Sequence, residues 1–170
     1  MDLKAFVRDV YDFPKPGIVF KDVTPMLKEP QAFKQCVLQM SVLLEDIDFD
    51  VMIAPEARGF IFAAPLAFHL GKSLVPVRKP GKLPYKTKSV EYDLEYGTAT
   101  LHMHEDAIEE GDRVLIVDDI LATGGTMKAI AGMIEECGGL VAGIVCLAEL
   151  GFLNPREKLS GYDVRTLISY

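Results

Sequence analysis

The sequence contains no tryptophan, only three histidines and only three cysteines among its 170 residues. Cys36, Cys137 and Cys146 lie far apart in apolar surroundings, without the close ligand spacing of a zinc site. His102 and His104 alternate along an expected strand, but two histidines without a third ligand do not predict a metal centre. We therefore expect reduced thiols, no metal held by protein side chains alone, and a cytoplasmic protein.

Basic charge and long apolar runs are also scarce. The chain has 18 Lys and Arg against 25 Asp and Glu, a formal net charge of −7. This balance argues against a nucleic-acid partner, because a phosphate backbone requires clustered basic residues. The most apolar uncharged run, 59–70, is too short to span a bilayer and contains Pro65. Residues 1–10 mix charges and lack the apolar core of a signal peptide, so we expect no membrane partner either.

The length and the hydrophobic periodicity predict a single domain, 1–170, of the α/β class. Residues 1–11 have a weak helical pattern, and a loop rich in Pro and Gly follows at 12–22. From Pro30, apolar residues recur at steps of three and four up to Ile47, which indicates a helix. Further helices at 63–70 and 125–137 alternate with apolar strands, which predicts a parallel sheet flanked by helices. The expected strands are 51–54, 74–77, 113–117 and 141–147. Ligands bind beyond the carboxyl ends of such strands.

The segment 78–97 fits neither the helical nor the strand period. Its first half also contains Pro80, Gly81 and Pro84. A long irregular segment inside a compact domain is often a lid or a binding loop. The alternative is a solvated hairpin with ordinary surface lysines. The basic residues of this segment are Arg78, Lys79, Lys82, Lys86 and Lys88.

Two adjacent carboxylates, Asp118 and Asp119, follow the expected strand 113–117. They repel each other, and burial raises the cost of charging both, so they need hydroxyl donors such as a ribose diol, or a cation. A loop of small residues then opens a helix, where glycine N–H groups, two hydroxyls and the helix N-terminus favour an anion. The loop consists of Ala122, Thr123, Gly124, Gly125 and Thr126. These residues by themselves predict a ribose 5-phosphate site.

Other motifs do not account for this segment. A P-loop requires a lysine directly after the glycines, whereas the next lysine is Lys128, and the dinucleotide fingerprint is absent. A purely structural turn would leave the aspartate pair unexplained. The strand, the Asp-Asp pair and the Ala-Thr-Gly-Gly-Thr loop resemble the phosphoribosyl pyrophosphate (PRPP) motif of type I phosphoribosyltransferases. The resemblance implies that the carboxylates hold the ribose hydroxyls and the loop holds the 5-phosphate.

Two segments resemble the base-binding parts of the adenine-specific branch of that family. Residues 13–25 are similar to its N-terminal hood, which spans about 1–30. The resemblance implies that the main chain of Val19 and Lys21 reads the adenine edge and that Phe20 stacks on the ring. For Phe20 the alternative is an ordinary core aromatic. The segment 149–159 resembles the part in which Leu153 covers the other face of adenine.

Two other segments resemble the catalytic parts of the same branch. In 54–60, the resemblance implies that Arg58 contacts pyrophosphate and that the Glu56–Ala57 peptide is cis. The segments 77–84 and 94–97 resemble a mobile catalytic loop of about 79–97. The resemblance implies that Arg78, Lys79 and Lys82 bind pyrophosphate. The implied catalytic residues are Arg58, Glu95 as an acid or base on the purine, and Tyr96 near the closed loop.

The resemblance further implies Mg²⁺ as the cofactor, held mainly by the substrate, and a homodimer. It implies transfer of the phosphoribosyl group of PRPP to adenine, giving AMP and pyrophosphate, a reaction of purine salvage. One alternative is a xanthine- or hypoxanthine-type enzyme, which shares the PRPP loop but not this hood. Another is a PRPP-sensing regulator without catalysis. A regulator would need a DNA-binding extension or a basic RNA-binding face, and this short acidic sequence shows neither.

Overall fold

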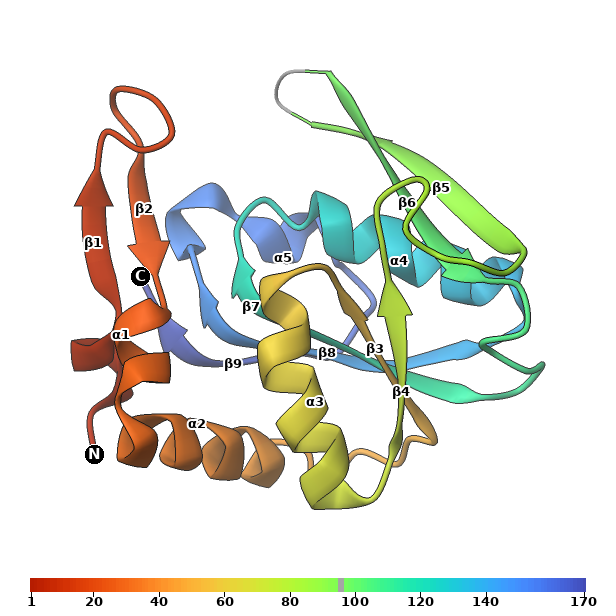
Figure 1. Ribbon diagram of the computed structural model, residues 1–170, viewed down its shortest axis with the longest axis horizontal. Coiled ribbons are helices and arrows are strands. Elements are labelled where there is room, and N and C mark those ends of the chain that lie inside the picture. The colour runs from red at the N-terminus through yellow and green to blue at the C-terminus, as the bar shows by residue number, and fades with distance from the viewer. Residues whose placement is uncertain (95–96) are drawn as a thin grey trace.

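A parallel sheet forms the centre of the computed structural model, which describes residues 1–94 and 97–170 (Figure 1). Its strands follow the order β4-β3-β7-β8-β9, and each neighbouring pair is parallel. The sheet is built from β3 (Val51–Pro55), β4 (Ser73–Val77), β7 (Arg113–Leu121), β8 (Leu140–Glu149) and β9 (Val164–Ser169). This arrangement confirms the α/β fold with a parallel sheet expected for the family.

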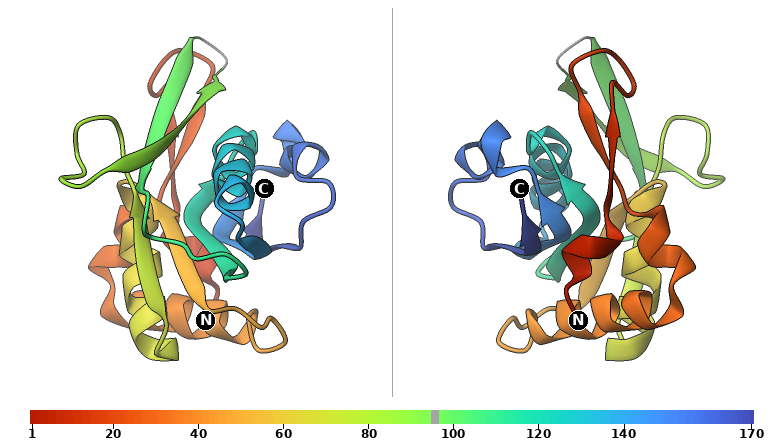
Figure 2. Two further views of the ribbon diagram at one scale, coloured as in Figure 1. Left: turned by 90° about the vertical axis from the view of Figure 1, so that its right-hand side faces the viewer. Right: turned by 90° about the vertical axis from the view of Figure 1, so that its left-hand side faces the viewer.

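Helices cover both faces of the sheet, with α2 (Pro30–Val42) and α3 (Arg58–Leu70) on one and α4 (Gly125–Glu136) on the other (Figure 2). Successive residues of a strand point to opposite faces. Leu115 and Val117 accordingly join the core under α2 and α3, whereas Val114 and Ile116 join the core under α4. Burial on both faces explains why 114–117, within β7, form an unbroken apolar run.

The N-terminal part forms a small separate layer beside the sheet. It consists of a 3₁₀ turn η1 (Leu3–Phe6), β1 (Arg8–Tyr11), β2 (Val19–Asp22) and α1 (Thr24–Lys28). Strands β1 and β2 pair only with each other among the described strands, in antiparallel register. The helical pattern expected over 1–11 was therefore wrong beyond η1, because charged cross-strand pairs fix 8–11 as a strand. These pairs are Arg8 with Asp22 and Asp9 with Lys21.

A second antiparallel pair, β5 (Thr87–Asp93) and β6 (Thr98–His104), corrects the prediction that 78–97 is irregular throughout. Val90 and Tyr92 pack on the core beside α4. Glu91 and Asp93 are exposed on the opposite face of the strand. The lysines of this segment hid that alternation. The pairing of 87–93 agrees with the hairpin alternative, but the hairpin packs on the core and is not fully solvated. Both hairpins, β1–β2 and β5–β6, rise beside the carboxyl ends of the central strands (Figure 1).

Several boundaries differ from the expected ones. Helix α2 ends at Val42, and the apolar positions up to Ile47 pack on the core from turns. Helix α3 already begins at Arg58, and β7 continues to Leu121, so the aspartate pair lies inside the strand rather than after it. Strand β9 was not expected. The short elements η2 (Gly151–Leu153) and α5 (Pro155–Lys158) connect β8 to it. No helix in the described ranges is long and apolar enough to cross a membrane.

Candidate active site

The two aspartates of β7 occupy different environments. The Asp119 side chain is buried, and its Oδ2 accepts a hydrogen bond from Nε of Arg58, the first residue of α3. Asp118 is half-buried, and its Oδ1 accepts the Asp119 N–H at 2.8 Å. Burial, followed by the neighbouring Asp119 charge, raises the pKa of the Asp118 carboxyl well above its ordinary value. The two carboxylates therefore need hydroxyl donors or a cation to stabilise both negative charges.

The surroundings of Asp118 leave little room. A Cβ on Gly59 would lie 2.9 Å from Asp118 Oδ1 and 3.2 Å from Pro55 Cδ, so α3 approaches β7 this closely only with glycine there. On the other side, Cys146 is the register partner of Asp118 in β8. Burial, with the Asp118 charge as the next cause, raises the pKa of the Cys146 thiol well above its ordinary value. The thiol stays protonated and acts as a small apolar side chain.

The loop of small residues between β7 and α4 encloses a compact cavity. The cavity has a volume of about 70 Å³ and is lined by Asp118 and by all five loop residues. Gly124 adopts φ of +85°, and a Cβ there would lie 2.8 Å from the Pro155 carbonyl oxygen. Helix α4 begins at Gly125, so its N-terminal N–H groups face the loop. The predicted residues Ala122, Thr123, Gly124, Gly125 and Thr126 thus form one anion-sized pocket.

A second cavity, of about 390 Å³, adjoins the first. The two cavities share Asp118, Ile120 and Thr126 in their linings. The larger one is also lined by Arg58, Lys79 and Asp119, so it places basic side chains opposite the carboxylates. The peptide bond between Glu56 and Ala57, at the same wall, is cis, as the resemblance implied.

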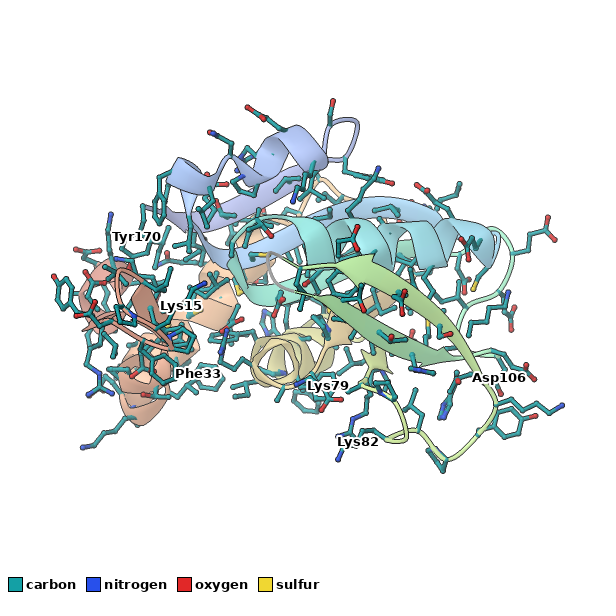
Figure 3. All side chains as sticks on the ribbon, turned by 90° about the horizontal axis from the view of Figure 1, so that it is seen from above. Lys15, Phe33, Lys79, Lys82, Asp106 and Tyr170 are labelled. Atoms are coloured by element: carbon teal, nitrogen blue, oxygen red, sulfur yellow. The ribbon has the colours of Figure 1, made fainter. Side chains whose placement is uncertain are left out.

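The basic segment after β4 is only partly assembled at this cavity. Glu56 accepts the Lys79 N–H at 2.5 Å and lies 3.5 Å from Nη2 of Arg78. The Lys79 N–H, more than the Arg78 charge, lowers the pKa of the Glu56 carboxyl. Lys82 lines neither cavity, and its side chain points outward from the turn before β5 (Figure 3). The structure therefore brings Arg58 and Lys79 to the cavity, Arg78 to its margin, and leaves Lys82 outside.

Of the expected base-binding residues, Phe20 contacts the lining of the larger cavity through Arg58. The Phe20 ring, in β2, lies 5.2 Å from Cζ of Arg58 and meets Phe13 edge to face at 5.2 Å. Phe20 is thus not an ordinary core aromatic. Val19 and Lys21 flank it in β2, and Leu153 is partly exposed in η2. A third cavity, of about 560 Å³, separates the turn before β2 from β5. Its lining is Pro14, Lys15, Ile18, Asp93, Leu94, Thr123 and Lys158.

Two expected site residues, Glu95 and Tyr96, lie outside the described residues. The structure adds Tyr92, which lines the 390 Å³ cavity and whose hydroxyl lies 3.2 Å from that of Thr126. The strand alternation of 90–93 was the signal that could have found it. His102 contacts the Thr87 hydroxyl at 3.0 Å, and His104 accepts the Tyr85 N–H at 3.4 Å. In the described part of the chain, no three His, Cys, Asp or Glu side chains gather as metal ligands.

Comparison with known proteins agrees with this geometry. Residues 26–167 match the Phosphoribosyl transferase domain family. The adenine phosphoribosyltransferase of Kosmotoga olearia is 69% identical over 170 residues, which cover 100% of both chains. That of Thermotoga maritima is 58% identical, over 100% of this chain and 98% of the relative.

Solved structures show the same likeness across the whole fold. The adenine phosphoribosyltransferase of Thermoanaerobacter pseudethanolicus has a TM-score of 0.97 at 54% identity, covering 99% of this chain and 98% of that one. The Saccharomyces cerevisiae enzyme, solved in a complex that includes adenine, has a TM-score of 0.90 at 35% identity, covering 98% and 96%. The chain therefore belongs to the phosphoribosyltransferase family and, within it, to the adenine phosphoribosyltransferases.

Proposed function

We propose that this chain transfers the 5-phosphoribosyl group of PRPP to adenine, giving AMP and pyrophosphate, a reaction of purine salvage. The observation that carries the proposal is the pair of adjoining cavities that share Asp118 and Thr126. One suits a phosphate at a helix N-terminus, and the other combines carboxylates with Arg58 and Lys79. That order suits a sugar with a phosphate at one end and a pyrophosphate at the other.

The ribose and its 5-phosphate fit the residues of β7 and the following loop. Ala122, Thr123, Gly124, Gly125 and Thr126 would donate N–H and hydroxyl groups to the phosphate. Asp118 and Asp119 would accept hydrogen bonds from the ribose hydroxyls. Arg58 already holds Asp119, so this carboxylate keeps one orientation before substrate arrives.

Mg²⁺ fits this donor set as a substrate-held ion. The cavity wall offers two adjacent carboxylates, and the described residues contain no cluster of three metal-ligating side chains. The ligands of Mg²⁺ are usually several waters, substrate oxygens and one or two carboxylates, and the aspartate pair could provide those carboxylates. When bound, the ion supplies positive charge that neutralises the departing pyrophosphate.

The basic residues would stabilise the leaving group. Displacement of pyrophosphate builds oxocarbenium character on the ribose, so the enzyme must hold a departing polyanion. Arg58 uses Nε for Asp119, which leaves its two terminal nitrogens for the anion. Lys79 and Arg78 add charge at the same wall, whereas Lys82 would contribute only through an inward movement of the turn at 79–86.

Adenine would bind between β2 and η2. Beyond its pairing with β1, strand β2 has no further strand partner among the described residues, so its other edge is free to offer N–H and C=O groups. The main chain of Val19 and Lys21 would match the acceptor N1 and the donor amino group of adenine. A 6-oxo purine would leave one of these groups unpaired. Phe20 and Leu153 would cover the two ring faces.

Three further assignments rest on the resemblance and extend this proposal. Glu95 would exchange a proton with the purine imidazole, and Tyr96 would lie near the closed loop.

We propose a homodimer, which the exposed apolar side chains of α3 support: Phe68 is 91% exposed and Ile61 39%. We also propose a cytoplasmic enzyme, because its cysteines are free thiols and two of them are buried.

The proposal is tested by incubating the protein with PRPP, Mg²⁺ and one purine base at a time, and identifying the nucleotide by chromatography. We expect AMP from adenine and little product from hypoxanthine, guanine or xanthine. Inosine or xanthosine monophosphate as the main product would overturn the adenine assignment. PRPP binding without turnover of any base would instead favour a regulator.

A further inference from the structure

Strand β2 is held from both faces by side chains. Phe20 lies on one face, 5.2 Å from the Arg58 guanidinium carbon. Because successive side chains alternate, Lys21 points to the other face. There its Nζ lies 4.0 Å from the centroid of the Tyr170 ring and 2.6 Å from Asp9 Oδ1. The Lys21 side chain is only 10% exposed, so this cation–π contact is largely shielded from water.

Tyr170 follows β9 and is fixed by its own main chain. Its N–H donates to the Glu149 carbonyl at 3.0 Å, and its carbonyl accepts the Gly151 N–H at 2.9 Å. Gly151 begins η2, the turn that carries Leu153. The structure thus joins the main chain of Tyr170 to one expected wall of the base site and its ring to the other. Tyr170 lies beside the N-terminal layer in Figure 3, and the end marked C lies beside β2 in Figure 1.

Strands β1 and β2 need such a contact because they pair with none of the central strands, although Leu3 and Met26 of the same layer are buried in the core under α2. No main-chain hydrogen bond among the described residues joins β1 or β2 to the central strands. An isolated two-stranded hairpin is marginally stable in water. The place of β2 relative to η2 therefore depends on side chains. The Tyr170 ring takes a second ammonium group in the same way, from Lys4 at 4.3 Å, whose Nζ also donates to the Ser169 carbonyl.

We propose that Tyr170 is a positioning residue for the base: it sets the separation between the main chain of β2 and the turn that carries Leu153. The proposal rests on the assignment of these two segments as the walls of the adenine site. Tyr170 itself does not touch substrate. It acts through the ammonium group of Lys21 and through the Gly151 N–H. Its loss should loosen adenine binding more than PRPP binding, because the 5-phosphate pocket lies on β7 and α4.

The test compares Tyr170→Leu with Tyr170→Phe in steady-state kinetics. We expect Tyr170→Leu to raise the KM for adenine about three- to thirtyfold, the range between a partly exposed and a desolvated cation–π contact, with a smaller change in the KM for PRPP. Tyr170→Phe should restore the wild-type value, because the buried Tyr170 hydroxyl has no hydrogen-bond partner among the described residues. A purely structural role would lower the active fraction and leave both KM values unchanged, which would overturn the proposal.

A matched control removes the same type of contact far from the site. Phe49 lies under the Lys72 ammonium at 4.9 Å, just before β3 and β4 begin, at the opposite end of the sheet. Phe49→Leu should lower the melting temperature with no change in the KM for adenine. An equal rise of that KM in Phe49→Leu would mean that general destabilisation, and not Tyr170, sets adenine affinity.

Two further variants keep the proposal testable if Tyr170→Leu folds poorly. Lys21→Met should raise the KM for adenine as Tyr170→Leu does. The double variant should raise it by less than the product of the two effects, because both variants remove the Lys21–Tyr170 contact. Full additivity would overturn the proposed coupling. Phe20→Leu separates the two proposals. If it raises the KM for adenine while Tyr170→Leu does not, only the role of Tyr170 fails. If it leaves that KM unchanged, β2 fails as a base wall and this inference fails with it.

Discussion

The hydroxyl groups of Tyr92 and Thr126 lie 3.2 Å apart, so β5 is joined by a side-chain hydrogen bond to the first turn of α4. Tyr92 also lines the cavity that holds Arg58 and Lys79. The β5–β6 hairpin thereby contacts Thr126, the last residue of the loop of small residues at 122–126. This contact connects two parts of the proposed PRPP site that are separated by 34 positions in the chain.

Tyr92→Phe removes that hydrogen bond and keeps the ring. We expect the KM for PRPP to rise about two- to tenfold, because a neutral hydrogen bond contributes about 0.5–1.5 kcal/mol. The KM for adenine should not change. Tyr162→Phe is the control, because the Tyr162 hydroxyl donates to Glu135 at 2.8 Å on an exposed surface. Equal KM values for PRPP in wild type and Tyr92→Phe would show that the contact does not orient Thr126.

Asp119→Asn tests the ion pair of the site, in which the Asp119 carboxylate is buried and the Arg58 side chain is 47% exposed. Arg58 would lose its charged partner, and a hydrogen bond to a charged group contributes about 1.5–3 kcal/mol. We expect kcat/KM for PRPP to fall roughly 10-fold or more. Asp163→Asn is the control, because it removes a carboxylate from a surface ion pair with Arg165. Such a pair contributes about 0–1 kcal/mol to stability, so kcat/KM for PRPP should not change. A similar kcat/KM for PRPP in both variants would contradict the assigned role of Asp119.

The raised pKa of Asp118 predicts a dependence of stability on pH. The folded protein binds more protons than the unfolded chain between the ordinary value of 3.8 and the raised pKa. This contribution to stability is therefore fully present below pH 3.8 and is lost as the pH rises through the raised pKa. The facing groups are Asp119, which raises the pKa further, and Arg58, which opposes the rise.

Asp118→Asn removes this titration. The melting temperature of the variant minus that of the wild type should therefore increase as the pH rises from about 4 to 7. Differential scanning fluorimetry across this range, in the absence of PRPP and Mg²⁺, measures the difference. A flat or decreasing difference for Asp118→Asn would show that Asp118 titrates without a raised pKa.

The sequence predicted which residues gather around the small cavity after β7, because these residues are contiguous in the chain. Asp118, Asp119 and the loop to Thr126 share one strand, one turn and one helix start, so local pattern and helix-terminus chemistry were sufficient. Tyr170 could not be found in this way, because its proposed role depends on a contact with Lys21, far away in sequence. The alternation of 90–93 could have marked Tyr92 as a core-facing residue, but not its contact with Thr126. Strand β9 was missed for the same reason: its partner is β8, and its own pattern is only partly apolar.

Gly59→Ala tests the close approach of α3 to Asp118. The new Cβ would lie 2.9 Å from Asp118 Oδ1 and 3.4 Å from the Val117 carbonyl oxygen, so the helix or the strand must move. Overpacking of this kind costs about 1–3 kcal/mol, equivalent to roughly 2–12 °C in melting temperature for a chain of this size. The KM for PRPP should rise as well, because Asp118 and Arg58 would no longer keep their relative positions.

Gly132→Ala is the matched control, because Gly132 lies inside α4 and a Cβ there meets nothing within 4 Å. Alanine is more favourable than glycine in a helix interior, so the free energy of unfolding of this variant should rise by about 0.5–1 kcal/mol. Its kinetic constants should not change. The two alanines should therefore shift the melting temperature in opposite directions. If Gly59→Ala melts at or above the wild-type temperature with an unchanged KM for PRPP, then α3 does not depend on glycine to bring Arg58 to Asp119.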